Sequence, residues 1–181
     1  MARTIDVLLS TYRPNEDWLK AQFASIWGQV DADVNLICRK DAGNLGARAS
    51  FSVLLRESRG DYVTFADQDD VWYRDKLAKS LARMQALESL YGRETPLLVF
   101  CDGWVTDEDL KPRSGTVISR QGVDVEKGLV FSRLLMQNFI AGNAMLFNAA
   151  LREKAGNVPT DALMHDSWLA LVGVRPHRVR E

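Results

Sequence analysis

The stretch Tyr62-Val63-Thr64-Phe65-Ala66-Asp67-Gln68-Asp69-Asp70-Val71-Trp72 joins two segments of opposite chemistry. Its first five residues are apolar, β-branched or aromatic, which is typical of a buried strand. Three carboxylates, on Asp67, Asp69 and Asp70, then follow within four positions. Carboxylates this close raise each other's pKa unless a cation neutralises them. Because ligands of open α/β sheets bind beyond the carboxyl ends of the strands, we expect this cluster to hold a divalent cation and, through it, a phosphate.

The alternative for these three carboxylates is a solvated loop that caps the next helix. Acidic side chains favour a helix N-terminus, and we expect Asp70 to be a cap or near-cap residue. Capping does not account for three carboxylates, and alternation along an extended chain would put Asp67 and Asp69 on one face. An EF-hand loop is excluded, because Val71 and Trp72 stand where that pattern needs an oxygen ligand and then glycine.

Strands alternate with helices on both sides of this stretch. Apolar runs predict further strands at residues 5–11, 34–38, 97–102 (with 103–106 continuing it) and 143–147. Helical spacing predicts a helix through Leu19, Phe23, Ile26 and Trp27 that ends at Gly28, and helices at 47–58 (stopped by Gly60), 74–91, 126–137, 149–155 and 166–172. In the helix over 74–91, Leu77, Leu81, Met84, Leu87 and Tyr91 form the inward stripe, and Lys76, Lys79, Arg83 and Glu88 lie largely outside it. Residues 107–123 are polar and are predicted to be a loop. The pattern indicates a single α/β domain with a mostly parallel sheet and helices on both faces.

Composition excludes several classes of protein. The chain has 181 residues, 46% of them hydrophobic and 26% charged, which fits one globular domain. Its net charge of −1 gives no global electrostatic case for nucleic-acid binding. Cys38 and Cys101, both in apolar runs, are interpreted as buried thiols in a reducing compartment. With no signal-peptide pattern and no run of about 20 apolar residues, we expect a cytoplasmic protein with at most peripheral membrane contact.

A second acidic motif, His165-Asp166, lies far along the chain. It can be a general base or a metal ligand near the rim of the sheet, or a plain helix N-cap aspartate beside a partly exposed histidine. A paired zinc site is not expected, because the other histidine is His177 in the tail. The same shortage of histidines disfavours a metal-dependent phosphohydrolase.

Two weaker signals concern glycines and tryptophans. Asn44-Leu45-Gly46 before a helix could cradle a phosphate, yet it lacks the spacing of a P-loop, and a plain turn is the simpler interpretation. Gly142 marks a bend or a close backbone approach. Most tryptophans are expected to pack in the core or at its rim, but Trp72 and Trp168 each adjoin an acidic motif and could wall a sugar pocket.

Together these segments resemble the family 2 glycosyltransferases of the GT-A fold, in particular their rhamnosyltransferase-like bacterial branch. The matching segments are residues 7–12, Asn44-Leu45-Gly46 followed by Ser50-Phe51, residues 60–72, residues 142–147, and Met164-His165-Asp166-Ser167-Trp168. The Asp-Gln-Asp-Asp and Met-His-Asp pieces, in this order, are the most specific of them.

The resemblance implies an inverting glycosyltransferase. Its donor would be a dTDP- or UDP-sugar, with rhamnose as a candidate sugar, and its acceptor a hydroxyl of a cell-surface polysaccharide precursor, lipid-linked or free, at the inner membrane face. Residues 1–102 would form the nucleotide-sugar-binding half and residues 103–181 the acceptor half of one domain. Mg²⁺ or Mn²⁺ would be the cofactor.

The resemblance also implies roles for single residues. Thr11, Tyr12 and Asp41 would lie near the nucleotide, Asp67 near the ribose and diphosphate, Asp69 together with Asp67 on the metal, and Asp166 would be the general base. The acceptor or sugar pocket would be formed by Trp72, Gly142, Asn143, His165 and Trp168.

The chain departs from the family pattern in two places. Lys40 stands where the first aspartate of the family's Asp-Asp-Gly-Ser motif stands, and a helix–strand unit is missing between there and Asn44. The family also continues past the Met-His-Asp helix, whereas this chain stops at Glu181. The alternative is therefore a shortened, non-catalytic remnant that acts as a binding or interaction domain.

Overall fold

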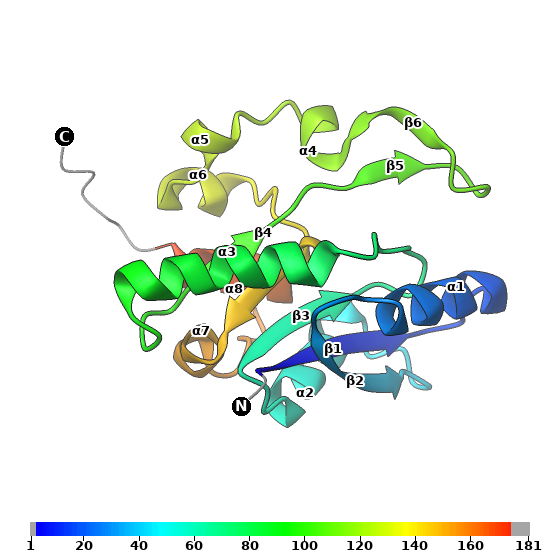
Figure 1. Ribbon diagram of the computed structural model, residues 1–181, viewed down its shortest axis with the longest axis horizontal. Coiled ribbons are helices and arrows are strands. Elements are labelled where there is room, and N and C mark those ends of the chain that lie inside the picture. The colour runs from blue at the N-terminus through cyan, green and yellow to red at the C-terminus, as the bar shows by residue number, and fades with distance from the viewer. Residues whose placement is uncertain (1–2, 175–181) are drawn as a thin grey trace.

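The computed structural model describes residues 3–174, so His177 and the basic tail lie outside the described residues. A five-stranded sheet with the order β2-β1-β3-β7-β4 forms the centre of the molecule (Figure 1). Its strands are β1 Thr4–Thr11, β2 Asp33–Lys40, β3 Tyr62–Ala66, β4 Leu98–Phe100 and β7 Met145–Asn148. β1 pairs in parallel with β2 and β3, and β7 runs antiparallel to β3 and β4. The predicted mostly parallel sheet is confirmed, with β7 as the reversed strand.

Helices cover both faces of this sheet, as predicted. On one face Ile5, Val7 and Leu9 of β1 pack against α1 (Glu16–Trp27) and α3 (Lys76–Tyr91). On the other face Leu8 packs with α2 (Ala47–Glu57), α7 (Ala149–Ala155) and α8 (His165–Gly173). All five residues of β3 are buried, because β3 lies in the middle of the sheet and is covered on both sides. The segment that carries Asp67, Asp69 and Asp70, called the acidic loop below, therefore begins at the end of a firmly packed strand.

The helix faces differ from the prediction at a few residues. Trp27 and Tyr91, assigned to inward stripes, are exposed, because each is the last residue of its helix. Glu88, assigned to the outer face of α3, is buried and paired with Arg3. Helix α2 ends at Glu57 with Ser58 as its C-cap, within one residue of the predicted end, and Gly60 lies two residues past the cap.

The segment after β4 is more ordered than the sequence indicates. β5 (Trp104–Thr106), expected as a continuation of the strand over 97–102, instead pairs with β6 (Pro112–Thr116) in a separate two-stranded sheet. β6 lies within residues 107–123, where a loop was expected. The short helix α4 (Val117–Arg120) follows, started by a capping box between Thr116 and Ser119. In Figure 1 this hairpin lies beyond α3, away from β1 and β2.

One expected helix over 126–137 is two short helices, α5 (Val125–Gly128) and α6 (Phe131–Met136). The break falls at Val130, which is in extended conformation. Gly128 is packed against Phe139 so closely that a Cβ there would come within 2.8 Å of its ring. This tertiary contact, which periodicity cannot show, accompanies the interruption.

The two cysteines are free, and the prediction that both are buried is wrong. Cys38 is exposed because β2 is the edge strand of the sheet, and Cys101, just after β4, is partly buried. Within residues 3–174, no helix has both the length and the apolar character that crossing a membrane requires.

Candidate functional site

The acidic loop follows β3 directly, on the rim where β1 also ends. Because β3 stops at Ala66, strand alternation does not extend to Asp67 and Asp69, although both are exposed there. The prediction that Asp70 caps the next helix is wrong, since α3 begins at Lys76 and its N-cap is Asp75. The three carboxylates are thus not explained by helix capping.

Gln68 fixes this loop against the end of β1. Its side-chain oxygen accepts a hydrogen bond from the Tyr12 backbone N–H at 2.9 Å, and its amide nitrogen donates to the Tyr12 carbonyl at 3.3 Å. The pair substitutes for strand pairing just past the register that ends at Leu9 and Ala66. Gln68 stands between two aspartates, and nothing in the local sequence indicates this role.

The other side of the loop is tied to the 3₁₀ turn η1 (Gly142–Ala144). The Asn143 side-chain amide donates to the Asp70 carboxylate. The backbone carbonyl of Asn143 accepts from Lys76 Nζ at 2.5 Å. The Lys76 ammonium also lies 3.5 Å from the centre of the Trp72 ring, a cation–π contact. Lys76, assigned to the outer face of its helix, therefore belongs to the site.

The charges in this network are partly withdrawn from water. Burial lowers the pKa of Lys76 to about 8, although Cys101, Asp70 and Asp67 act in the opposite direction. Burial also raises the pKa of Asp70, although Asn143 and Lys76 oppose this rise. Each charge is thus stabilised mainly by its neighbours in the network and only weakly by solvent.

Asp67 has the electrostatic environment of a cation ligand. Desolvation first, and then the carboxylates of Asp70, Asp69 and Asp166, raise the pKa of Asp67 to about 7, although part of the residue reaches solvent. A proton relieves this repulsion by neutralising one carboxylate, whereas a divalent ion carries two charges and would act on several carboxylates at once. Among the described residues no group of three or more His, Cys, Asp or Glu side chains is placed to hold a metal. Asp67 and Asp69, which line one cavity, are the carboxylates of the acidic loop that could contribute to a cation site.

Asp166 lies in the first turn of α8, near enough to Asp67 for its charge to raise the Asp67 pKa. Its carboxylate accepts from the Ser167 N–H at 2.6 Å. The N-cap of α8 is Met164, so the capping interpretation of Asp166 is wrong. Gly142 packs against this turn, because a Cβ at that position would stand 3.4 Å from Asp166 Cβ.

His165 is buried and not partly exposed. Its ring stacks on Phe51 with centroids 4.3 Å apart and meets Phe65 edge-on at 4.6 Å. Burial lowers the pKa of His165 to about 4, so the imidazole is neutral at neutral pH. The ring packs between α2 and β3 and lines none of the three cavities described below, so its position does not support a place in a sugar pocket.

Thr11 and Asp41 meet where β1 and β2 end. Thr11 is buried, and its carbonyl accepts from the Asp41 N–H at 2.8 Å. The backbone N–H of Leu45 above all, together with Ser50 Oγ at 3.0 Å, lowers the pKa of the Asp41 carboxyl. Asp41 therefore shapes the loop before α2 as well as facing the cavity beside it.

A cavity of about 290 Å³ brings several predicted residues together on this rim. Its lining is Ser10, Tyr12, Asp41, Asn44, Gly46, Ala47, Phe51, Asp67, Gln68 and Asp69. Of the residues expected near a nucleotide or metal, Tyr12, Asp41, Asp67 and Asp69 line it, and Thr11 does not. The turn at Asn44-Leu45-Gly46 also contributes, with Asn44 and Gly46 at positive φ.

A second cavity, of about 490 Å³, lies on the opposite side of the acidic loop and includes Trp72 and Asn143 in its lining. Trp168 lines neither cavity. Its indole N–H donates to the Ala155 carbonyl at 3.1 Å, which packs α8 on α7. Its position therefore does not support the predicted role as a pocket wall.

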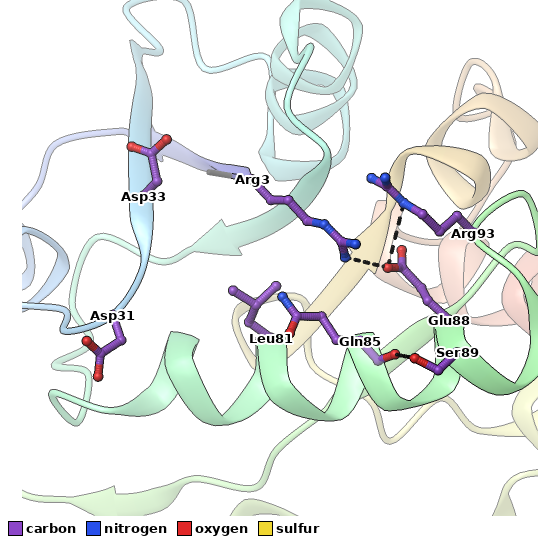
Figure 2. Close-up of a pocket in the computed structure, with 8 residues that line it drawn as sticks. All are labelled: Arg3, Asp31, Asp33, Leu81, Gln85, Glu88, Ser89 and Arg93. Atoms are coloured by element: carbon purple, nitrogen blue, oxygen red, sulfur yellow. Dashed lines mark hydrogen bonds and ion pairs between the residues drawn. The ribbon is translucent and has the colours of Figure 1, made fainter. Parts of the chain in front are cut away.

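The largest of the three cavities, about 750 Å³, lies away from the acidic loop, beside the N-terminal ends of β1 and β2. Figure 2 shows Arg3 and Arg93 pointing toward Glu88. Arg3 Nη1 lies 2.8 Å from the Glu88 carboxylate, and Arg93 Nε lies 3.9 Å from it. Tyr62 also donates to Glu88 at 2.8 Å. These groups satisfy one another, so this cavity offers a structural ion-pair cluster and no candidate chemistry.

Comparisons with known proteins bear on the family and the fold. Residues 21–93 match the family model described as Glycosyl transferase family 2. The fold is similar to that of the mannosyltransferase PcManGT from Pyrobaculum calidifontis, solved in complex with GDP-Man and Mn2+ (18% identity, TM-score 0.60, 97% of this chain and 54% of that one). It is also similar to S. aureus TarS 1-349 in complex with UDP (12% identity, TM-score 0.59, 93% and 54%).

This chain therefore spans about half the length of the solved structures it matches. A search of curated proteins by sequence gives no match. The fold is that of a GT-A type α/β domain. The family model supports the resemblance to the family 2 glycosyltransferases over residues 21–93, and the solved structures show a similar fold over nearly the whole chain.

Proposed function

We propose that this chain is the donor-binding and catalytic core of a metal-assisted, inverting glycosyltransferase. One observation carries the proposal: Asp67 and Asp69 line a cavity at the end of β3, and the charge of Asp166 acts on Asp67 from another element. Transfer of a glycosyl group from a nucleotide diphosphate needs a cation near the diphosphate and a base near the acceptor hydroxyl. The rim of this sheet offers carboxylates for both.

The donor nucleotide would occupy the cavity of about 290 Å³. Tyr12 and the loop from Asp41 to Gly46 would surround the base and ribose, with Thr11 supporting that loop from beneath. The solved relatives named above were crystallised with GDP-Man and with UDP, which supports a nucleotide-sugar donor for this fold.

Asp69 and Asp67 would hold Mg²⁺ or Mn²⁺, together with oxygens of the donor diphosphate. When bound, the ion neutralises the charge that builds on the departing diphosphate, a contribution of several kcal/mol. Asp67 binds such an ion only after losing its proton, and its pKa of about 7 makes that loss available near neutral pH.

Asp166 would act as the general base. As the acceptor oxygen forms its bond to the anomeric carbon, the O–H bond breaks and the proton passes to the carboxylate, while the bond from that carbon to the diphosphate oxygen breaks. Attack on the face opposite the leaving group inverts the anomeric centre through an oxocarbenium-like transition state. Neutral, buried His165 supports α8 in this scheme and takes no proton.

The finer assignments follow the sequence resemblance. The donor would be a dTDP- or UDP-sugar, with rhamnose as the candidate sugar, and the acceptor a polysaccharide precursor at the cytoplasmic face of the membrane. The two free cysteines are in keeping with a reducing compartment. Residues 1–102 would bind the donor and residues 103–181 the acceptor.

The experiment is a transfer and donor-hydrolysis assay with a panel of nucleotide sugars and Mn²⁺, comparing the wild-type chain with Asp166→Asn. The exchange keeps the size and removes the base, so we expect turnover to fall by roughly 10²- to 10⁴-fold with donor affinity unchanged. A wild-type chain that folds cooperatively but releases no sugar from any donor would favour the non-catalytic remnant, which the direct passage from β2 to α2 makes the alternative.

A further inference from the structure

The cavity of about 490 Å³ is formed by α3, the hairpin β5–β6, α4 and the turn η1. It touches the proposed catalytic site at one end only. There Asp70 lines it, and the adjacent Asp69 lines the donor cavity. The acidic loop therefore forms a partition, with a donor cavity on one side and this second cavity on the other.

The chemistry of the second cavity changes along its length. At the partition the lining is polar, with Asp70, Lys76 and Asn143 joined in one hydrogen-bonded network. At the hairpin and α4 the lining is mainly apolar, with Trp104, Leu110, Val117 and Ile118. Asp102 and Thr106 are its polar members there, and the Asp102 carboxylate accepts from the Ile118 N–H. Trp104 and Leu110 are 52% and 51% exposed, so about half of the surface of each of these apolar side chains faces solvent.

We propose that this cavity binds an amphiphilic glycoside as the acceptor, with its sugar hydroxyls at the Asp70–Asn143 end and its apolar aglycone against the Trp104 wall. The identity of the ligand as the acceptor rests on the proposed function. A free sugar would leave the apolar side chains of the hairpin in contact with water, so the favourable free energy of burying them would not be gained. A hydrocarbon without hydroxyls would desolvate the Asp70 carboxylate and the Lys76 ammonium without offering them hydrogen bonds.

The chain carries a natural reporter for occupancy. Cys101 lines the second cavity, whereas Cys38 is exposed on β2 at the opposite edge of the sheet. A ligand in the cavity shields the Cys101 thiol from alkylation and leaves the Cys38 thiol accessible. The ratio of the two rates is therefore independent of reagent decay and of any general effect of the ligand on thiol reactivity.

The test compares hexyl β-glucoside with methyl β-glucoside, which differ only in the aglycone, during iodoacetamide alkylation followed by mass spectrometry of the Cys101 and Cys38 peptides. Because each buried methylene adds several-fold to affinity, half-protection of Cys101 should need at least roughly tenfold less hexyl than methyl glucoside. Trp104→Ala should remove this preference. Trp27→Ala, which truncates an exposed tryptophan of α1 outside the cavity, should keep it.

Equal protection by the two glucosides, equal protection of Cys38, or an unchanged preference in Trp104→Ala would each overturn the proposal. The proposed function is judged separately, by UDP binding with Mn²⁺ in the same proteins. Selective protection of Cys101 without nucleotide binding supports the cavity and contradicts the donor site. Nucleotide binding without protection does the reverse.

Discussion

Asp67 is the residue whose ionisation is most altered by the fold. Its pKa lies at about 7 against an ordinary 3.8, first through desolvation and then through neighbouring carboxylates. A carboxyl group with a raised pKa holds its proton better when folded. Its contribution to stability is therefore present at low pH and is lost as pH rises from about 4 to about 7.

Asp67→Asn should remove this pH dependence, because the amide keeps the shape and carries no charge. We expect the variant to melt at a higher temperature than the wild type at pH 8, with the difference shrinking as the pH approaches 4 in metal-free buffer. Thermal unfolding at a series of pH values measures this. The exposed residue Asp161, changed to Asn, is the control and should show no such trend; a constant offset for Asp67→Asn would refute the electrostatic interpretation.

Gly142 determines how closely η1 approaches α8. A Cβ at this position would lie 3.1 Å from His165 Nε2 and 3.4 Å from Asp166 Cβ. Gly142→Ala should therefore displace the first turn of α8, costing about 1–3 kcal/mol of stability and lowering transfer more than it lowers UDP binding. Urea unfolding compares the stability cost with that of Gly43→Ala, which adds the same methyl group where no atom lies within 4 Å. Steady-state kinetics and UDP binding are measured for Gly142→Ala against the wild type, because Gly43 lies in the proposed nucleotide loop. Equal effects of the two substitutions would show that the contact with α8 is irrelevant.

Single residues mark the limit of what periodicity predicts. Asp67, Asp69 and Tyr12 could be placed on one rim because strand ends of a parallel sheet share an edge. Lys76 and Glu88 could not, since both sit at polar positions of an amphipathic helix and were assigned to solvent. Each is instead held in the protein by long-range partners, Asn143 for Lys76 and Arg3 for Glu88. Nothing in the local sequence announces such partners.

At the scale of elements, the connection between α2 and β3 is organised by one buried carboxylate of β1. Asp6 accepts from Ser58 Oγ at 2.8 Å, from the N–H groups of Arg59 and Gly60 at 2.7 Å each, and from the Asn35 side chain at 2.8 Å. Burial alone would raise the pKa of Asp6, but these bonds outweigh it and lower the pKa. The group therefore stabilises the fold above its ordinary pKa of 3.8, and the contribution is lost as pH falls below that value.

In Asp6→Asn an N–H₂ group replaces one carboxylate oxygen. This group cannot accept hydrogen bonds, so it would face donors that lose their acceptor. We expect a loss of about 3 kcal/mol in the free energy of unfolding at pH 7, measured by urea denaturation. Asp33→Asn, at the exposed start of β2, is the matched control and should cost far less. A small effect at Asp6 would mean that another group anchors this connection, on which the position of β3 depends.

The elements themselves could be predicted where amphipathic periodicity is long or a strand is fully buried, as for α3, α7 and β3. The hairpin β5–β6 could not, because its strands are short, mostly exposed and interrupted by Gly115 at positive φ. The break between α5 and α6 coincides with the close packing of Gly128 against Phe139, a tertiary contact that periodicity cannot show. The apolar wall of the second cavity lies in the hairpin and α4, so the sequence does not predict this cavity.

At the scale of the whole molecule, the sheet order brings two remote acidic motifs to one rim. Asp67 directly follows β3, the central strand of the sheet. Helix α8 packs on the same face of the sheet as α2, and its Asp166 lies near enough to Asp67 to raise the Asp67 pKa. The acidic loop between them separates two cavities of different chemistry. This arrangement makes metal-dependent binding of a nucleotide diphosphate the central claim.

Isothermal titration calorimetry with UDP and dTDP, with and without Mn²⁺, tests that claim most directly. We predict that at least one nucleotide binds only when Mn²⁺ is present, and that Asp69→Asn abolishes this binding while the variant remains folded. Binding that needs no metal, or that Asp69→Asn leaves unchanged, would contradict the account.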